Sequence, residues 1–194
     1  MSSITSLCVY CGSRPGNRPG YRMLAESLGR ETAKRGMTLV YGGGQVGLMG
    51  LAARAALANG GRVVGIIPEH LDEVEIAQTG LSELHVVKDM HTRKRMMFER
   101  SDAFLVLPGG MGTLDEFIEM TTWSQLGLHD KPILLLDHEG YWQPLIDLIE
   151  HVIAEGFASP SNLELFSVVA DLEEAFDILA RAPVTQRETH PDLI

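Results

Sequence analysis

Short apolar segments alternate with amphipathic segments along almost the whole chain, and this alternation restricts the possible folds more than any other feature. The expected strands cover residues 4–10, 38–41, 62–67, 84–87, 103–107, 133–137 and 166–169. The expected helices cover residues 21–35, 48–59, 89–100, 113–126, 141–155 and 171–181. Apolar strands separated by helices are typical of a mainly parallel sheet covered on both faces. The sequence therefore predicts an α/β, Rossmann-like doubly wound fold.

The chain has the length of one ordinary domain, and no linker long enough to divide its 194 residues is visible. We expect a single Rossmann-like domain over residues 1–181. Residues 182–194 have turn-forming and polar character, and we expect them to form a loosely ordered tail.

The net charge of −10 argues against a nucleic-acid polymer as partner, because phosphate polymers need a broad basic surface. The longest apolar runs, such as Ile133 to Leu136, are too short to span a membrane. The N-terminus lacks the pattern of a secretory signal, so a cytoplasmic location is expected.

Cys8 and Cys11 form the only CxxC pattern of the sequence. They fall at the end of the first expected strand, where residues three apart point to opposite faces and cannot grip one ion. We therefore expect two buried cysteines and no metal site.

Ligands of doubly wound folds bind beyond the carboxyl ends of the strands, so the residues just after each strand are the most informative ones. Three of four such strand ends carry glycine: Cys11–Gly12–Ser13, Gly42–Gly43–Gly44, Pro68–Glu69 and Pro108–Gly109–Gly110.

The segment from Gly42 to Gly47 satisfies GxGxxG between a strand and a helix, which taken alone favours a dinucleotide. However, it follows the second strand, and the next strand ends in Ile67–Pro68 without an acidic residue for a ribose. A loop that contacts a phosphate or ribose and a purely structural tight turn both remain open.

A second glycine-rich segment, Gly109–Gly110–Met111–Gly112–Thr113, precedes the helix expected at residues 113–126. Free amides at a helix N-terminus favour a phosphate, and glycines leave them accessible. The local alternative is a capping box, with Thr113 as N-cap and Glu116 three residues later. From this window alone, capping is the favoured interpretation of Glu116.

The densest positive cluster comprises Arg93, Lys94, Arg95 and Arg100. Its ordinary interpretation is a solvated helix face. Arg93 and Lys94, however, begin a helix at the ligand side of the sheet, where a guanidinium suits a phosphate or a carboxylate.

The segments MHTRK (90–94) and PGGMGTLDE (108–116) together closely resemble the LOG family of cytokinin riboside 5′-monophosphate phosphoribohydrolases. The resemblance extends from about residue 4 to residue 180. It implies hydrolysis of the N-glycosidic bond of a nucleoside 5′-monophosphate, without a cofactor, by a homodimer.

The resemblance also implies the site residues. The catalytic pair would be Arg93 and Glu116. The residues that contact the nucleotide would be Glu75, Met90, Lys94, Gly109, Gly110, Gly112 and Thr113. A carboxylate suits this reaction because it stabilises an oxocarbenium-like sugar and orients a water.

Three other functions stay open at this point: a general AMP or purine-nucleotide nucleosidase, a non-catalytic nucleotide-binding protein, and, more remotely, a dehydrogenase. The helix expected at 113–126 is apolar nearly all round, which is typical of a core or an interface helix.

Overall fold

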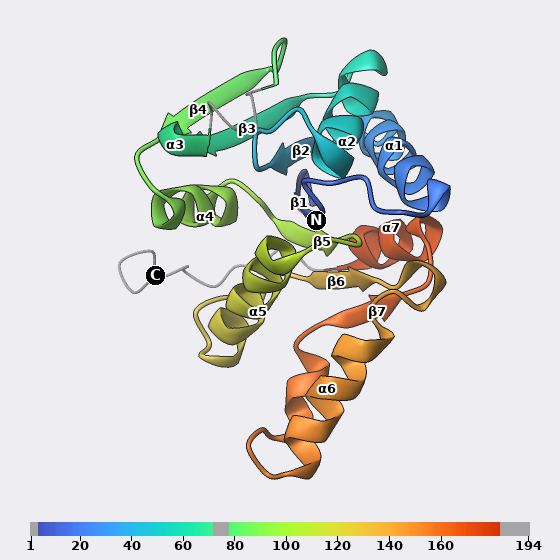
Figure 1. Cartoon of the computed structure of the whole chain (residues 1–194), viewed down its shortest axis with the longest axis vertical. Coiled ribbons are helices and arrows are strands. Elements are labelled where there is room, and N and C mark those ends of the chain that lie inside the picture. Colours follow the sequence, from blue (N-terminus) through green and yellow to red (C-terminus); the bar gives the residue numbers. More distant parts are fainter. Residues whose placement is uncertain (1–3, 72–77, 183–194) are drawn as a thin grey trace.

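The computed structural model describes residues 4–71 and 78–182. In this part of the chain, one all-parallel sheet of seven strands has the order β4-β3-β2-β1-β5-β6-β7 (Figure 1). The strands are β1 (Ser6–Tyr10), β2 (Thr38–Tyr41), β3 (Val63–Pro68), β4 (Glu83–Val87), β5 (Ala103–Val106), β6 (Ile133–Leu136) and β7 (Ser167–Val169). The expected α/β, Rossmann-like fold is confirmed.

Helices cover both faces of the sheet (Figure 1). They are α1 (Pro19–Lys34), α2 (Gly47–Ala58), α3 (Glu69–Leu71), α4 (Met90–Glu99), α5 (Met111–Gln125), α6 (Gln143–Ala154) and α7 (Leu172–Arg181), with 3-10 turns η2 (His138–Gly140) and η3 (Pro160–Glu164). One core contains buried residues of α1, α2 and α7, and the other contains those of α4 and α5 with the inner side chains of α6. Successive β1 residues alternate between these cores, as the two-residue period of a strand requires.

The two cysteines lie in different cores, Cys8 in that of α4 and α5 and Cys11 in that of α1 and α2. Both are free and buried, and burial raises the pKa of each thiol well above its usual range. Their expected placement on opposite faces is confirmed. The described residues contain no cluster of three or more His, Cys, Asp or Glu side chains arranged to hold a metal.

β1 and β5 are neighbours in the middle of the sheet, and the strand order reverses between them. The strands β2, β3 and β4 follow outward from β1, and β6 and β7 follow outward from β5. In folds of this kind a crevice opens beyond the carboxyl ends of the strands at such a reversal. The loops that follow β1 and β5 therefore mark the expected ligand site. Within the described ranges, no helix combines the length and apolarity needed to cross a membrane.

Candidate active site

The loops after β1 and β5 are bonded to each other at the point of reversal. The Gly12 amide donates to the carbonyl oxygen of Pro108 at 3.1 Å, and the Gly12 carbonyl accepts from the Leu48 amide at 2.9 Å. A Cβ on Gly12 would lie 2.9 Å from the carbonyl oxygen of Arg14, so the tight course of the loop after β1 depends on glycine. This contact joins the starts of α2 and α5 above the sheet.

The helix α5 begins at Met111, two residues before the expected position, and its N-cap is Gly110. The first intrahelical bond runs from the Leu114 amide to the Gly110 carbonyl oxygen at 3.0 Å. Thr113 is therefore inside the first turn, and the capping box predicted for Thr113 and Glu116 is wrong. Because Gly110 has no side chain to cap the helix, the amides that precede Leu114 keep their capacity to bind a ligand.

A cavity of about 140 Å³ lies over the start of α5. Arg93 from α4 and Glu116 from α5 both line it, although 23 positions separate them in the sequence. Its other walls come from the loops after β1 and β5, from α2 and from the first turn of α5: Cys11, Ser13, Met49, Gly110, Met111, Gly112 and Thr113. The structure thus brings together the predicted catalytic pair and three of the four predicted loop residues.

The charge of Glu116 acts within this cavity. Burial is the main reason why the pKa of the Cys11 thiol is raised, and the negative charge of Glu116 raises it further. The carboxylate of Glu116 thus lies close enough to the end of β1 to influence the Cys11 thiol.

Arg93 is 5% exposed and is held by the first glycine-rich loop. Its Nη2 donates to the carbonyl oxygen of Gly42 at 2.9 Å, and its Nη1 lies 3.7 Å from Met90 Sδ. Its Nε is buried and finds no hydrogen-bond partner in the described part of the chain. An arginine with an unsatisfied buried donor at the edge of a cavity is suited to an anionic ligand.

The loop Gly42–Gly44 accepts a hydrogen bond from Arg93 and leaves room for its guanidinium. A Cβ on Gly42 would lie only 1.9 Å from Arg93 Nη2, and Gly43 has a φ of +80°, which favours glycine. The three glycines are buried. The interpretation of this GxGxxG segment as a structural turn therefore accounts for Gly42 and Gly43.

Lys94 lies outside this cavity. Its Nζ pairs with Glu119 Oε1 at 3.0 Å and with Asp115 Oδ2 at 3.2 Å, both on α5. Burial lowers the pKa of Lys94, but the bonds to Glu119 and Asp115 outweigh this effect and raise it. The positive charge is thus already compensated by protein carboxylates.

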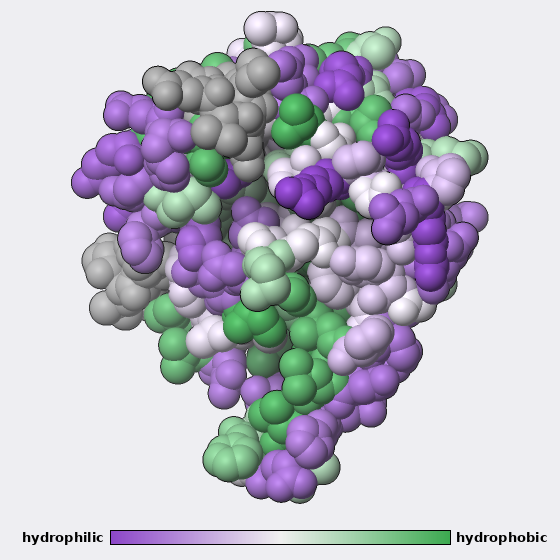
Figure 2. Space-filling model, viewed as in Figure 1, coloured by the Kyte–Doolittle hydropathy of each residue, from purple (hydrophilic) through white to green (hydrophobic). Residues whose placement is uncertain are grey.

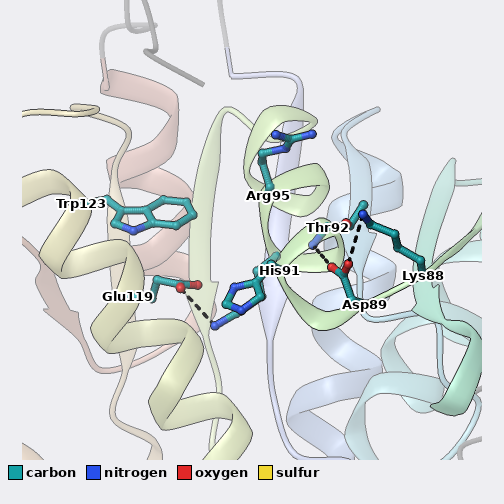
Figure 3. A pocket seen from close by; sticks show the side chains of 8 residues that line it. Lys88, Asp89, His91, Thr92, Arg95, Glu119 and Trp123 are labelled. Atoms are coloured by element: carbon teal, nitrogen blue, oxygen red, sulfur yellow. Dashed lines mark hydrogen bonds and ion pairs between the residues drawn. The ribbon is translucent and has the colours of Figure 1, made fainter. Parts of the chain in front are cut away.

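A separate cavity of about 350 Å³ runs between α4 and α5 next to Lys94. Figure 3 shows His91 and Arg95 on one side of it and Glu119 and Trp123 on the other. The four predicted cations therefore do not form one anion site. Arg95 pairs with Glu99 at 3.6 Å and Arg100 with Glu83 at 3.0 Å, so only Arg93 faces the cavity over α5.

Gly109 borders a third cavity, of about 470 Å³, which shares Ser13, Gly110 and Met111 with the one over α5. Its remaining lining is Gly12, Arg14, Gly16, Tyr21, Leu48, Pro108 and Tyr141. Met90, another predicted contact, lies beside the guanidinium of Arg93, and Glu75 lies outside the described residues.

The sequence patterns gave no indication of Met49, Tyr21 or Tyr141 as lining residues. Met49 lies two residues after Gly47 in the first turn of α2, and the two tyrosines stand near helix starts, positions that local periodicity does not distinguish. The end of the first strand, Cys11 to Ser13, was the one signal that pointed to this wall.

The arrangement joins an arginine and a set of helix-start amides, which suit an anion, to a carboxylate that suits a developing positive charge. A molecule with a phosphate at one end and a cleavable sugar bond at the other fits both requirements.

Comparison with known proteins supports the same class of ligand. The family model described as "Possible lysine decarboxylase" matches residues 49–179. The cytokinin riboside 5′-monophosphate phosphoribohydrolase of Rhodococcoides fascians is 52% identical over 171 residues, which are 88% of this chain and 86% of the relative. An Arabidopsis thaliana protein of the same name is 48% identical over 160 residues, 82% of this chain and 75% of the relative.

Among solved structures, the molybdenum cofactor binding protein of Rippkaea orientalis superimposes with a TM-score of 0.68 and 20% identity. The match covers 92% of this chain and 96% of that protein, and at this identity it supports the fold alone.

Proposed function

We propose that this chain, which belongs to the LOG family of cytokinin riboside 5′-monophosphate phosphoribohydrolases, hydrolyses the N-glycosidic bond of N6-substituted adenosine 5′-monophosphate. The products are the free cytokinin base and ribose 5-phosphate. The observation that carries this proposal is the single cavity lined by Arg93, Glu116 and the uncapped start of α5.

In the proposed reaction the 5′-phosphate lies on the free amides at the start of α5, where the helix dipole favours an anion. Thr113 and the open glycines Gly110 and Gly112 border it, and neither glycine has an atom within 4 Å of an added Cβ. Arg93 supplies the positive charge, for the phosphate or for keeping Glu116 ionised and aimed.

Glu116 then acts on the sugar. The bond between C1′ and the base nitrogen breaks with both electrons going to the base, which takes up a proton as it leaves. The carboxylate of Glu116 stabilises the positive charge at C1′, orients the water whose oxygen bonds to that carbon and accepts the proton that this water loses.

We do not propose a lysine decarboxylase activity, although the description of the family model names one. A lysine that carries a pyridoxal group must stand in the active cavity. The chain has four lysines, and none lines the cavity of Arg93 and Glu116: Lys34, Lys88 and Lys94 form ion pairs, and the Lys131 Nζ donates to the Phe98 carbonyl oxygen.

We also propose a homodimer in the cytoplasm. Figure 2 shows a band of hydrophobic side chains over α5 and α6. The exposed large residues on or next to these helices include Ile118, Leu126, Leu148 and Phe157. A second copy of the chain that covers this band would remove it from water, which supports an interface there.

The proposal is tested by release of free base from AMP and from isopentenyl-AMP. Wild type, Glu116→Gln and the control Asp115→Asn are compared. Asp115 precedes Glu116, is exposed and pairs with Lys94 outside the cavity, so its replacement removes a carboxylate of α5 without touching the proposed site.

We expect Glu116→Gln to lose at least about 100-fold in kcat while Asp115→Asn stays within a few-fold of wild type. A higher rate on isopentenyl-AMP than on AMP identifies the cytokinin nucleotide as substrate, and the reverse order identifies a general AMP nucleosidase. Bound nucleotide without any base release would refute the hydrolase and leave a binding protein.

A further inference from the structure

The loop between β5 and α5 is held from two sides. On one side the Gly12 amide donates to the carbonyl oxygen of Pro108 at 3.1 Å. On the other, the Tyr141 hydroxyl donates to the carbonyl oxygen of Gly109 at 2.5 Å, across 32 positions of sequence. The second contact comes from the segment after β6, and no sequence motif indicated it.

The position of Tyr141 is set by the turn at the end of β6. Asp137 donates its amide to the Val169 carbonyl oxygen and accepts the Trp142 amide on its side chain. The Tyr141 ring packs edge-on against Tyr21 at 5.7 Å and against Trp142 at 4.8 Å. These aromatic contacts fix the ring independently of its hydroxyl.

The bond to Gly109 determines the direction of an amide. The Gly109 carbonyl and the Gly110 amide belong to one peptide group, and the described peptide bonds are all trans. In a planar trans peptide the C=O and N–H point in opposite directions. With the carbonyl fixed on Tyr141, the Gly110 N–H faces away from Tyr141.

Glycine at both positions would otherwise leave this peptide free to rotate, because glycine has few steric restrictions. A Cβ on Gly110 would meet no atom within 4 Å, whereas one on Gly109 would lie 2.1 Å from Thr113 Oγ1, so packing restrains only the Gly109 side of this peptide. Tyr141 therefore supplies a restraint that the loop lacks.

We propose that Tyr141 is a positioning residue, which holds the Gly109–Gly110 peptide so that its N–H joins the amides at the start of α5 in binding the 5′-phosphate. This inference rests on the proposed function, because it assumes that a phosphate occupies the cavity over α5. Tyr141 acts through the loop and need not touch the reacting atoms.

The test compares wild type, Tyr141→Phe and the matched control Tyr21→Phe. Phenylalanine at 141 keeps the ring contacts and removes only the hydroxyl. Tyr21 lines the same 470 Å³ cavity, and no hydrogen bond is found for its hydroxyl among the described residues. Calorimetry measures binding of ribose 5-phosphate, which carries the phosphate, and of adenosine, which lacks it.

We expect Tyr141→Phe to weaken ribose 5-phosphate binding about 5- to 30-fold, as the loss of one ordering hydrogen bond implies, and to leave adenosine within about twofold. For the nucleotide, KM should rise while kcat stays within about twofold, because Arg93 and Glu116 are unchanged. Tyr21→Phe should bind both ligands as wild type does.

Equal weakening of both ligands, or unchanged ribose 5-phosphate binding, would overturn the assignment of Tyr141. Absence of ribose 5-phosphate binding in wild type would overturn the phosphate loop and this inference together. If wild type binds ribose 5-phosphate but releases no base, the proposed function fails, and the selective loss in Tyr141→Phe still supports the positioning role.

Discussion

The guanidinium of Arg93 donates to the carbonyl oxygen of Gly42 at 2.9 Å, and this bond ties α4 to the loop after β2 across 51 positions of sequence. It explains the first glycine of the GxGxxG segment, although the proposed phosphate site lies elsewhere. The first glycine gives the buried guanidinium room beside the backbone, and the second adopts a left-handed conformation. The arginine is thereby aimed at the cavity that Glu116 also lines.

Replacing Gly42 by alanine should displace the Arg93 side chain and so reduce activity, although Arg93 itself is not substituted. The new methyl would lie 1.9 Å from Nη2, so the side chain must move. We expect base release to fall at least about 10-fold, with a loss in stability of about 1–3 kcal/mol from overpacking. Steady-state kinetics and urea unfolding measure the two effects.

The control for Gly42→Ala is a double-mutant cycle with Arg93→Lys. If Gly42 acts through the arginine, Gly42→Ala should cost much less activity in the Arg93→Lys background than in wild type. Full additivity of the two losses would contradict this role.

Removing the charge of Lys94 should reduce stability. The Lys94→Met change leaves Glu119 without its cation, and one carboxylate oxygen of Glu119 is already buried and unpaired among the described residues. We expect a loss of about 1–3 kcal/mol in the free energy of unfolding, measured in urea.

The matched control for this loss is Arg181→Met on α7. Its pair with Asp177 is 3.5 Å long and highly exposed on both sides, so its removal should cost less than about 0.5 kcal/mol. Equal effects of the two substitutions would show that the Lys94 pairs behave like ordinary surface ion pairs.

Lys131 should make stability depend on pH in the alkaline range. Burial lowers its pKa to about 8, even though nearby Asp102 raises it. Between this value and the unfolded pKa of about 10.4, the unfolded chain binds more protons than the folded one, so stability rises with pH. Below about pH 8, both states are protonated and the contribution is constant.

The measurement is the free energy of unfolding of wild type minus that of Lys131→Met, from pH 7.5 to 10.5. We expect the difference to shift in favour of wild type by up to about 3 kcal/mol. Lys131 Nζ also donates to the Phe98 carbonyl at 2.7 Å and lies 3.8 Å from the centre of the Phe98 ring, two contacts that favour its charge. If the difference in free energy of unfolding did not change with pH, the two contacts with Phe98 would outweigh the effect of burial on the pKa of Lys131.

The apolar band over α5 and α6 should be required for dimer formation. A double substitution, Leu148→Glu with Phe157→Ser, places a charge and a hydroxyl at two exposed positions, since Leu148 is 56% and Phe157 87% exposed. We expect light scattering to report a dimer for wild type and a monomer for this variant. Met23→Glu, 66% exposed on α1, should remain dimeric, and a dimeric double variant would move the interface elsewhere.

Much of the site followed from the sequence because its signals are local. The pair formed by MHTRK and PGGMGTLDE placed Arg93 and Glu116 at the starts of two helices, and both line one cavity. The start of α5 could not be settled in this way, because Gly110 and Thr113 are both good cap residues. In the fold, a Cβ on Gly109 would lie 2.1 Å from Thr113 Oγ1, which shows how closely Thr113 is packed inside the first turn.

The sequence by itself determined the order of strands and helices along the chain and the glycine-bearing strand ends, because hydrophobic period and motif spacing are properties of neighbouring residues. The proposed catalytic pair, Arg93 and Glu116, came from the resemblance of two motifs to the LOG family. Only the tertiary structure decided that the Gly42 carbonyl oxygen accepts a hydrogen bond from Arg93, that two carboxylates of α5 neutralise Lys94 and that the Tyr141 hydroxyl donates to the Gly109 carbonyl oxygen. Each of these contacts joins loops or helices that follow different strands. Their partners are chosen by the strand order and by the burial of charge, which no local pattern specifies.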